Sequence, residues 1–175
     1  MRRLKLDLNG ILLRLKISRY TPSTRDDWDS QWCDVDFSFS SGTWLDYHRE
    51  NDEVLLSCEV ETLAENIGKL LNDEINEVTE ISCIEPDFNF TLHPKRDLRD
   101  DPKYTYVREG YEIADIYMEW TVTFWNEGLT DNYLSVTLDR EDMKILLVYL
   151  NYVIGKYAAN DQEIENLIKR DFLTD

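Results

Sequence analysis

The chain has 175 residues, a hydrophobic fraction of 42% and a formal net charge of −17, which suits one domain with its own core and excludes an intrinsically disordered chain. The negative charge disfavours direct binding to nucleic acid or to an anionic membrane, because both attract basic proteins, and it favours a basic protein partner. A simpler interpretation is that the acidity only keeps the protein soluble.

The first part of the chain has the alternating pattern of β-strands. Asn9-Gly10 separates two alternating apolar runs, and because both residue types tolerate positive φ angles, the pair predicts a tight hairpin or a strand bend. Residues 32–41 alternate between apolar and polar side chains, which predicts a half-buried strand. Further strands are predicted from Trp44 and across residues 53–61.

A helix is predicted to begin at Thr62, which forms a capping box with Glu65. The apolar residues that follow recur on one helical face: Leu63, Ile67, Leu70, Leu71 and Ile75. Residues 78–93 predict a strand that is interrupted or bent near Pro86. Residues 94–111 contain two prolines, one glycine and nine charges, and they predict a long charged loop or hairpin insertion.

The second half predicts two strands followed by two helices. Residues 113–125 alternate with an apolar face that includes Met118 and Trp120, and residues 133–138 return as the next strand. Asp139 caps a helix that runs to about Tyr157, and a short C-terminal helix is expected within residues 158–175. We therefore expect one α+β domain across residues 1–175. It should have a mainly antiparallel sheet of about six to eight strands with two or three helices packed on one face.

The cysteines indicate a reducing compartment. Cys33, Cys58 and Cys83 are odd in number and too widely spaced for a zinc knuckle. No stretch is apolar for 18 residues, and the start lacks the apolar region of a signal peptide. We expect a cytoplasmic protein with buried, reduced thiols.

Few residues suggest catalysis. The two histidines, His48 and His93, lie outside any recognisable nucleophile motif, and no glycine-rich phosphate loop is present. Asp26, Asp27 and Asp29 are spaced poorly for a calcium loop. A metal-dependent hydrolase that uses these aspartates, with His48 as a further candidate, stays open as an alternative, but the preferred interpretation has no metal, cofactor or catalytic residue.

Charge and aromatic residues indicate candidate binding surfaces instead. Residues 45–87 contain thirteen acids and only two bases, and three tyrosines lie in the charged insertion, where burial is least expected. The candidate partner-binding residues are Asp46, Glu50, Asp52, Glu53, Asp73, Glu74, Tyr104, Tyr106 and Tyr111. Trp28, Trp32 and Trp44 are expected to pack in or against the core, with interface anchoring as the alternative.

The segment LKISRYTPSTRDDWDSQWCDVDFSFSSG resembles the opening of the wall-associated-protein immunity (WapI) family. The matching residues are Tyr20, Asp26, Trp28, Asp29, Trp32 and Val35, whereas Cys33 stands where the family usually has leucine. The segments LSCEVETLAENIGKLLN, EISCIEPDFNFTLHP and YLSVTLDREDMKILLVYLNYVI resemble later steps of the family, so that the resemblance covers residues 11–157. The insertion at 94–111 and the segment after Tyr157 are longer than the family pattern.

The resemblance implies a non-catalytic immunity protein. Such proteins bind the toxic C-terminal domain of a polymorphic, contact-dependent toxin inside the producing cell, and the toxin of the founding system is similar to a tRNA-cleaving nuclease. Asp26, Trp28, Asp29 and Trp32 would then be structural residues of the family. A generic acidic interaction or oligomerisation module is the remaining alternative, and the sequence predicts no oligomeric state.

Overall fold

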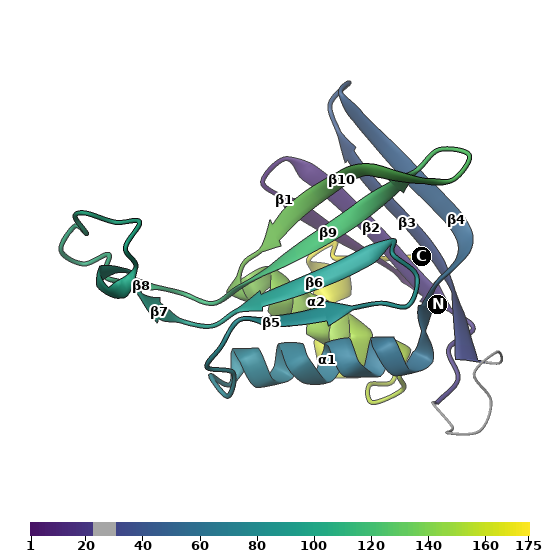
Figure 1. The fold of residues 1–175 in the computed structure, drawn as a ribbon. Coiled ribbons are helices and arrows are strands. Elements are labelled where there is room, and N and C mark those ends of the chain that lie inside the picture. The colour runs from purple at the N-terminus through teal and green to yellow at the C-terminus, as the bar shows by residue number, and fades with distance from the viewer. Residues whose placement is uncertain (23–30) are drawn as a thin grey trace.

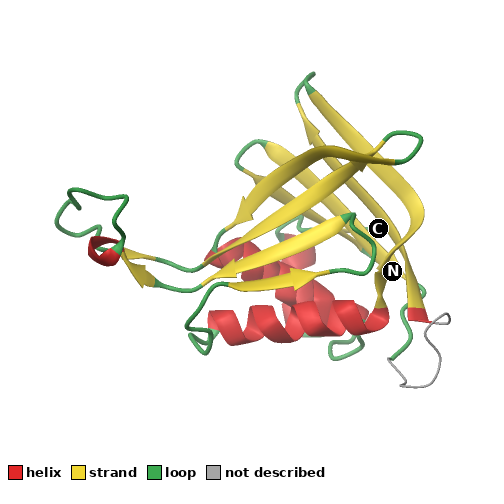
Figure 2. Ribbon diagram, in the orientation of Figure 1, coloured by secondary structure: helices red, strands yellow, loops and turns green. Residues whose placement is uncertain are grey.

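The computed structural model describes residues 1–22 and 31–175, which form two large antiparallel sheets, a two-stranded sheet and three α-helices (Figure 1). Sheet A contains, in spatial order, β11 (Leu173–Thr174), β1 (Arg3–Leu8), β2 (Ile11–Ser18), β3 (Trp32–Ser41) and β4 (Leu45–Leu56). Sheet B contains β10 (Leu129–Leu138), β9 (Tyr117–Trp125), β6 (Phe88–His93) and β5 (Thr79–Ser82). The helices α1 (Ser57–Leu71), α2 (Arg140–Val153) and α3 (Gln162–Lys169) lie together on one side of the sheets (Figure 2).

The expected α+β class is confirmed. Of the eleven strands in the described residues, β7 (Arg96–Asp97), β8 (Ile113–Ala114) and β11 have only two residues each, which leaves eight longer strands, within the expected number. These strands form two sheets, whereas one sheet was expected. The reason is that the chain leaves sheet A through α1 and pairs β5 with β6 instead of returning to β4.

Aromatic side chains fill the space between the two sheets. Phe37 of β3 meets Phe88 of β6 edge to face, with ring centroids 4.9 Å apart, and Phe39 meets Trp120 of β9 at 5.7 Å. These four side chains are at most 2% exposed and belong to a single core that also includes the inner faces of the helices. Successive side chains of a strand point to opposite faces of its sheet. The residues between the core residues of each strand therefore lie on the outer face.

The hairpin predicted at Asn9-Gly10 is confirmed. Asn9 and Gly10 have φ angles of 55° and 91°, the left-handed values that a two-residue hairpin turn requires. Their conformation sets the register in which Leu8 lies opposite Ile11 and Leu6 opposite Leu13. Leu4, Leu6, Leu13 and Leu15 face the core in this register.

The predicted start of the first helix is wrong, because α1 begins at Ser57 and not at Thr62. Glu59 accepts hydrogen bonds from the backbone N–H of Leu56 (2.8 Å) and of Ile84 (2.6 Å), and the Ser57 hydroxyl donates to the carbonyl of Gln31 (3.0 Å). The strand predicted across residues 53–61 therefore ends at Leu56, and it is the last part of the long strand β4.

The predicted interruption near Pro86 is confirmed, and the chain turns there, so that residues 78–93 form a hairpin of two strands and not a single bent one. Ile81 of β5 lies opposite Phe90 of β6, and Pro86 lies in the connection between the strands.

Asp139 caps α2 as predicted, since its side chain accepts from the backbone N–H groups of Glu141 and Asp142. The helix ends at Val153, earlier than the predicted Tyr157. After α3, the C-terminal residues pair with β1, with Leu173 opposite Leu4.

Candidate partner-binding surfaces

Residues 94–114 form a projecting arm that continues the hairpin of β6 and β9 (Figure 1). At its base β7 pairs with β8, and a short 3-10 helix, η2 (Leu98–Asp100), follows β7. Tyr106 is 79% exposed and Tyr111 63% exposed, and Tyr104 and Ile113 are exposed as well. The arm contains five basic and five acidic residues, so it is neutral in a chain whose net charge is strongly negative.

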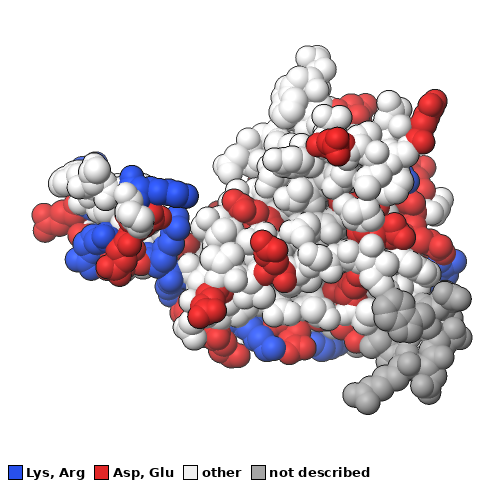
Figure 3. Space-filling model, in the orientation of Figure 1, with Lys and Arg blue, Asp and Glu red and all other residues white. Residues whose placement is uncertain are grey.

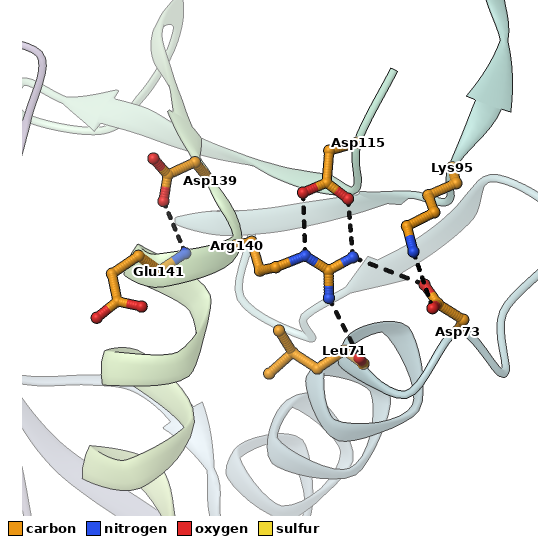
Figure 4. Close-up of polar contacts among 7 residues, drawn as sticks. All are labelled: Leu71, Asp73, Lys95, Asp115, Asp139, Arg140 and Glu141. Carbon is orange, nitrogen blue, oxygen red and sulfur yellow. Dashed lines mark hydrogen bonds and ion pairs between the residues drawn. The ribbon is translucent and has the colours of Figure 1, made fainter. Parts of the chain in front are cut away.

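The base of the arm is joined to both large helices by Arg140 of α2 (Figure 4). The Arg140 guanidinium donates to both carboxylate oxygens of Asp115, at 3.0 and 2.8 Å, and to the carbonyl of Leu71 at the end of α1, at 3.3 Å. Asp73 lies 3.7 Å from the same guanidinium and accepts from Lys95 at 2.9 Å. The paired arginine lowers the pKa of Asp115 to about 2, and Lys95 and Arg140 lower the pKa of Asp73.

The predicted partner-binding acids lie in two separate places. Asp46, Glu50, Asp52 and Glu53 lie along β4, whereas Asp73 and Glu74 follow α1 near the base of the arm, on the opposite side of the molecule (Figure 1). Several of these acids already have cationic neighbours. Asp52 pairs with Arg49, Glu53 with Arg19, and Asp73 with Lys95. The structure therefore does not gather the predicted residues into one acidic surface.

The tryptophan-rich segment is described only in part. Asp26, Asp27, Trp28 and Asp29 lie outside the described residues, and Trp32 opens β3, half-buried and opposite Leu56. Trp44 was expected to pack in or against the core, but its side chain is 68% exposed, because it lies in the turn between β3 and β4 that closes with the Trp44 N–H donating to the Ser41 carbonyl.

The outer face of sheet B is a further candidate surface, which the sequence analysis did not identify. In one row across the strands lie Ser82, Asn89, Thr121 and Ser135, and in the next row lie Glu80, Thr91, Glu119 and Thr137. Thr123 and Tyr133 are opposite each other at one end of the face, and His93 and Tyr117 at the other. We call these residues the threonine face. Figure 3 shows this side of the molecule as mainly white with scattered red, whereas blue side chains gather on the arm and along the lower edge.

The outer face of sheet A has a different character, because its long charged side chains are paired with one another. Lys16 donates to Asp36 at 3.1 Å, Arg19 lies 3.0 Å from Asp34, and Arg3 lies 3.8 Å from Asp36. Arg3 of β1, Lys16 of β2 and Arg19, directly after β2, thus neutralise acids of β3. A small surface cavity of about 120 Å³ lies beside Arg3 and Arg14 on this face.

Asp87 is an acid buried at the junction of the sheets, only 3% exposed, and its Oδ1 has no hydrogen-bond partner. Burial and the nearby Asp52 carboxylate raise the pKa of Asp87 to about 6, although Arg49 opposes this effect. The backbone of Asp87 continues the pairing of β6 with β9 within sheet B, since its carbonyl accepts from the N–H of Thr123 at 2.9 Å.

The histidines and cysteines of the described residues form no disulfide and no histidine cluster. His93 stacks on Tyr117, with centroids 4.1 Å apart, and contacts Glu119, whereas His48 is exposed beside Asp46. The three cysteines are free thiols, and burial raises the pKa of each. In the described part of the chain, no group of three or more His, Cys, Asp or Glu residues could hold a metal ion. No helix among residues 1–22 and 31–175 is long and apolar enough to span a membrane.

Comparison with known families gives one match. The model of the family described as "Immunity protein WapI-like family" matches residues 3–158, which include both sheets except β11, together with α1, α2 and the whole arm. No curated protein matches the chain.

Proposed function

The chain belongs to the WapI-like immunity protein family, and from this premise we propose that it is a non-catalytic inhibitor that binds and neutralises a cognate toxin domain. The family match over most of the chain is the observation that carries this proposal. The partner would be the C-terminal domain of a polymorphic, contact-dependent toxin, bound in the cytoplasm of the producing cell before the toxin can act.

We further propose that the toxin domain is basic and of the nuclease type. A nuclease domain presents cationic side chains to nucleic-acid phosphates, and a protein with a net charge of −17 attracts such a surface over long range. The free acidic protein would then associate quickly at low salt and more slowly as salt screens the charges.

The predicted contact residues divide into the β4 group and the group on the arm and at its base. An interface of ordinary size buries about 800 Å² on each partner, which favours contact with one group and not with both. We assign the arm group, because Tyr104, Tyr106 and Tyr111 are exposed aromatic side chains, the type that most often anchors protein interfaces.

The test is co-expression of the chain with the C-terminal toxin domain encoded by the gene directly upstream. Cells that make the toxin domain alone should stop growing, and cells that make both proteins should survive. The purified proteins should form a complex in a pull-down experiment, and the chain should block the nuclease activity of the toxin domain on RNA. No complex and no rescue of growth would refute the proposal, whereas rescue without nuclease activity would refute only the nuclease assignment.

A further inference from the structure

We propose that the threonine face of sheet B, together with the arm at its end, is the surface on which the cationic toxin domain docks. This inference rests on the proposed function and adds to it the location of the interface. It differs from an interface on the predicted acids of β4, because the central contact would be a sheet face of mainly short polar side chains.

The first argument is the cost of removing water from each open sheet face. On sheet A, docking would bury the ion-paired side chains of Lys16, Arg19 and Asp36, which are strongly hydrated and lose much rotamer freedom. On sheet B, the central rows consist mainly of short hydroxyl and amide side chains such as Thr121, Ser135 and Asn89. These groups lose little entropy, and interface centres are typically poor in charged residues.

The second argument is the continuity of the face with the arm. β7 and β8 extend the same hairpin that contributes β6 and β9 to the face, and the stacked rings of His93 and Tyr117 lie where the sheet passes into the arm. At the other end of the face, Tyr133 is 67% exposed. The face is therefore bordered by aromatic side chains at both ends. The arm, which carries exposed tyrosines, extends from the end formed by His93 and Tyr117 (Figure 1).

The third argument concerns the kind of partner. The fixed charges within the rows of the threonine face are the carboxylates of Glu80 and Glu119, and these rows contain no Lys or Arg in the described strands. A cationic protein surface can pair with these acids after the long-range field has attracted it. A second copy of the chain would instead bring two net charges of −17 together, which disfavours self-association on this face.

The test compares an arginine placed on each sheet. Thr121→Arg adds a long cation in the centre of the threonine face. Ser38→Arg is the matched control, since Ser38 has a comparable position on the outer face of β3, an interior strand of sheet A. Binding of each purified variant to the upstream-encoded toxin domain is measured by calorimetry, and the melting temperature shows that each variant folds. Tyr133→Ala serves as a second variant of the face, because its exposed side chain can be removed without opening the core.

We expect Thr121→Arg and Tyr133→Ala to raise the dissociation constant by about tenfold or more, and Ser38→Arg to change it by less than about twofold. Wild-type binding that neither variant of the face weakens would overturn the docking surface and leave the proposed function intact. Failure of the wild-type protein to bind the toxin domain would overturn both. A dimer of the wild-type chain in light scattering that Thr121→Arg dissociates would also overturn the inference, because a second copy would then occupy the face.

Discussion

Arg140 and Asp115 form a bidentate ion pair, in which the guanidinium donates to both carboxylate oxygens at 3.0 and 2.8 Å. Arg140 is the first residue of α2, and Asp115 directly follows β8, so this pair joins the helical layer to the base of the arm (Figure 4). Because Arg140 also contacts the end of α1, the direction in which the arm projects is fixed by both large helices.

Replacement of Arg140 by alanine should loosen the arm without unfolding the domain. Amide hydrogen exchange of residues 94–114 should become faster by about tenfold, while the free energy of unfolding falls by no more than about 1 kcal/mol, because the paired groups are partly exposed. Arg140→Lys keeps the charge but not the bidentate hydrogen bonding, and it should give an intermediate exchange rate. Unchanged exchange in the alanine variant would show that the pair does not hold the arm.

Tyr106 tests the contribution of the arm to binding. Tyr106→Ala should raise the dissociation constant for the toxin domain by about tenfold, since exposed tyrosines are frequent interface anchors. The melting temperature should stay constant, because the Tyr106 side chain is 79% exposed. Trp44→Ala is the matched control, because Trp44 is another largely exposed aromatic residue, 68% exposed, in the turn between β3 and β4. Equal weakening by both variants would argue against a specific role of the arm.

Glu59 should be important for stability, because its carboxylate joins the start of α1 to the connection between β5 and β6 through the N–H groups of Leu56 and Ile84. Glu59→Ala leaves both donors without this acceptor and should lower the free energy of unfolding in urea by about 2 to 3 kcal/mol. Glu59→Gln keeps one acceptor oxygen and should lose less. An alanine variant as stable as the wild type would contradict this role.

The same residue explains why the sequence did not reveal where the helix begins. Val54, Leu56, Cys58 and Val60 alternate like a strand, and the contact that ends this strand involves Ile84, far along the chain. By contrast, the Asn9-Gly10 hairpin and the Asp139 cap depend only on neighbouring residues, and both were predicted correctly. Local signals were sufficient where the structure is determined locally.

The candidate surfaces, too, could be predicted only where they depend on neighbouring residues of the sequence. The exposed tyrosines of the arm could be predicted from the local composition of residues 94–111. The network at the base of the arm could not, because Asp73, Lys95, Asp115 and Arg140 come from four separate parts of the chain. The threonine face also depends on which strands pair and in which register, and a single strand pattern indicates only that one of its faces is polar.

Tyr149 shows how tertiary structure gives a helical residue a role that periodicity does not predict. Its side chain is fully buried, and its hydroxyl accepts from the backbone N–H of Ile17 at 2.8 Å. Tyr149→Phe keeps the ring but removes the acceptor, so the free energy of unfolding should fall by about 1 to 3 kcal/mol. Tyr152→Phe, a half-buried tyrosine on the same helix, is the control and should cost less. Equal stability of the Tyr149 variant and the wild type in urea would contradict the importance of this bond.

Because of Asp87, the protein should be more stable in mild acid than at neutral pH. Its pKa is raised from 3.8 to about 6 by burial and by Asp52, so the folded state holds a proton more tightly than the unfolded chain, and stability from this group increases as the pH falls from about 6 to about 4. Asp87→Asn removes the buried charge and should raise the free energy of unfolding at neutral pH by an amount on the order of 2 kcal/mol. This advantage should shrink towards about pH 5. Asp131→Asn, on an exposed part of β10, makes the same substitution without a buried carboxylate and is the control. Urea unfolding at neutral pH and at about pH 5 measures the difference in stability between the variant and the wild type. An Asp87→Asn variant that is less stable than the wild type at neutral pH would refute this prediction.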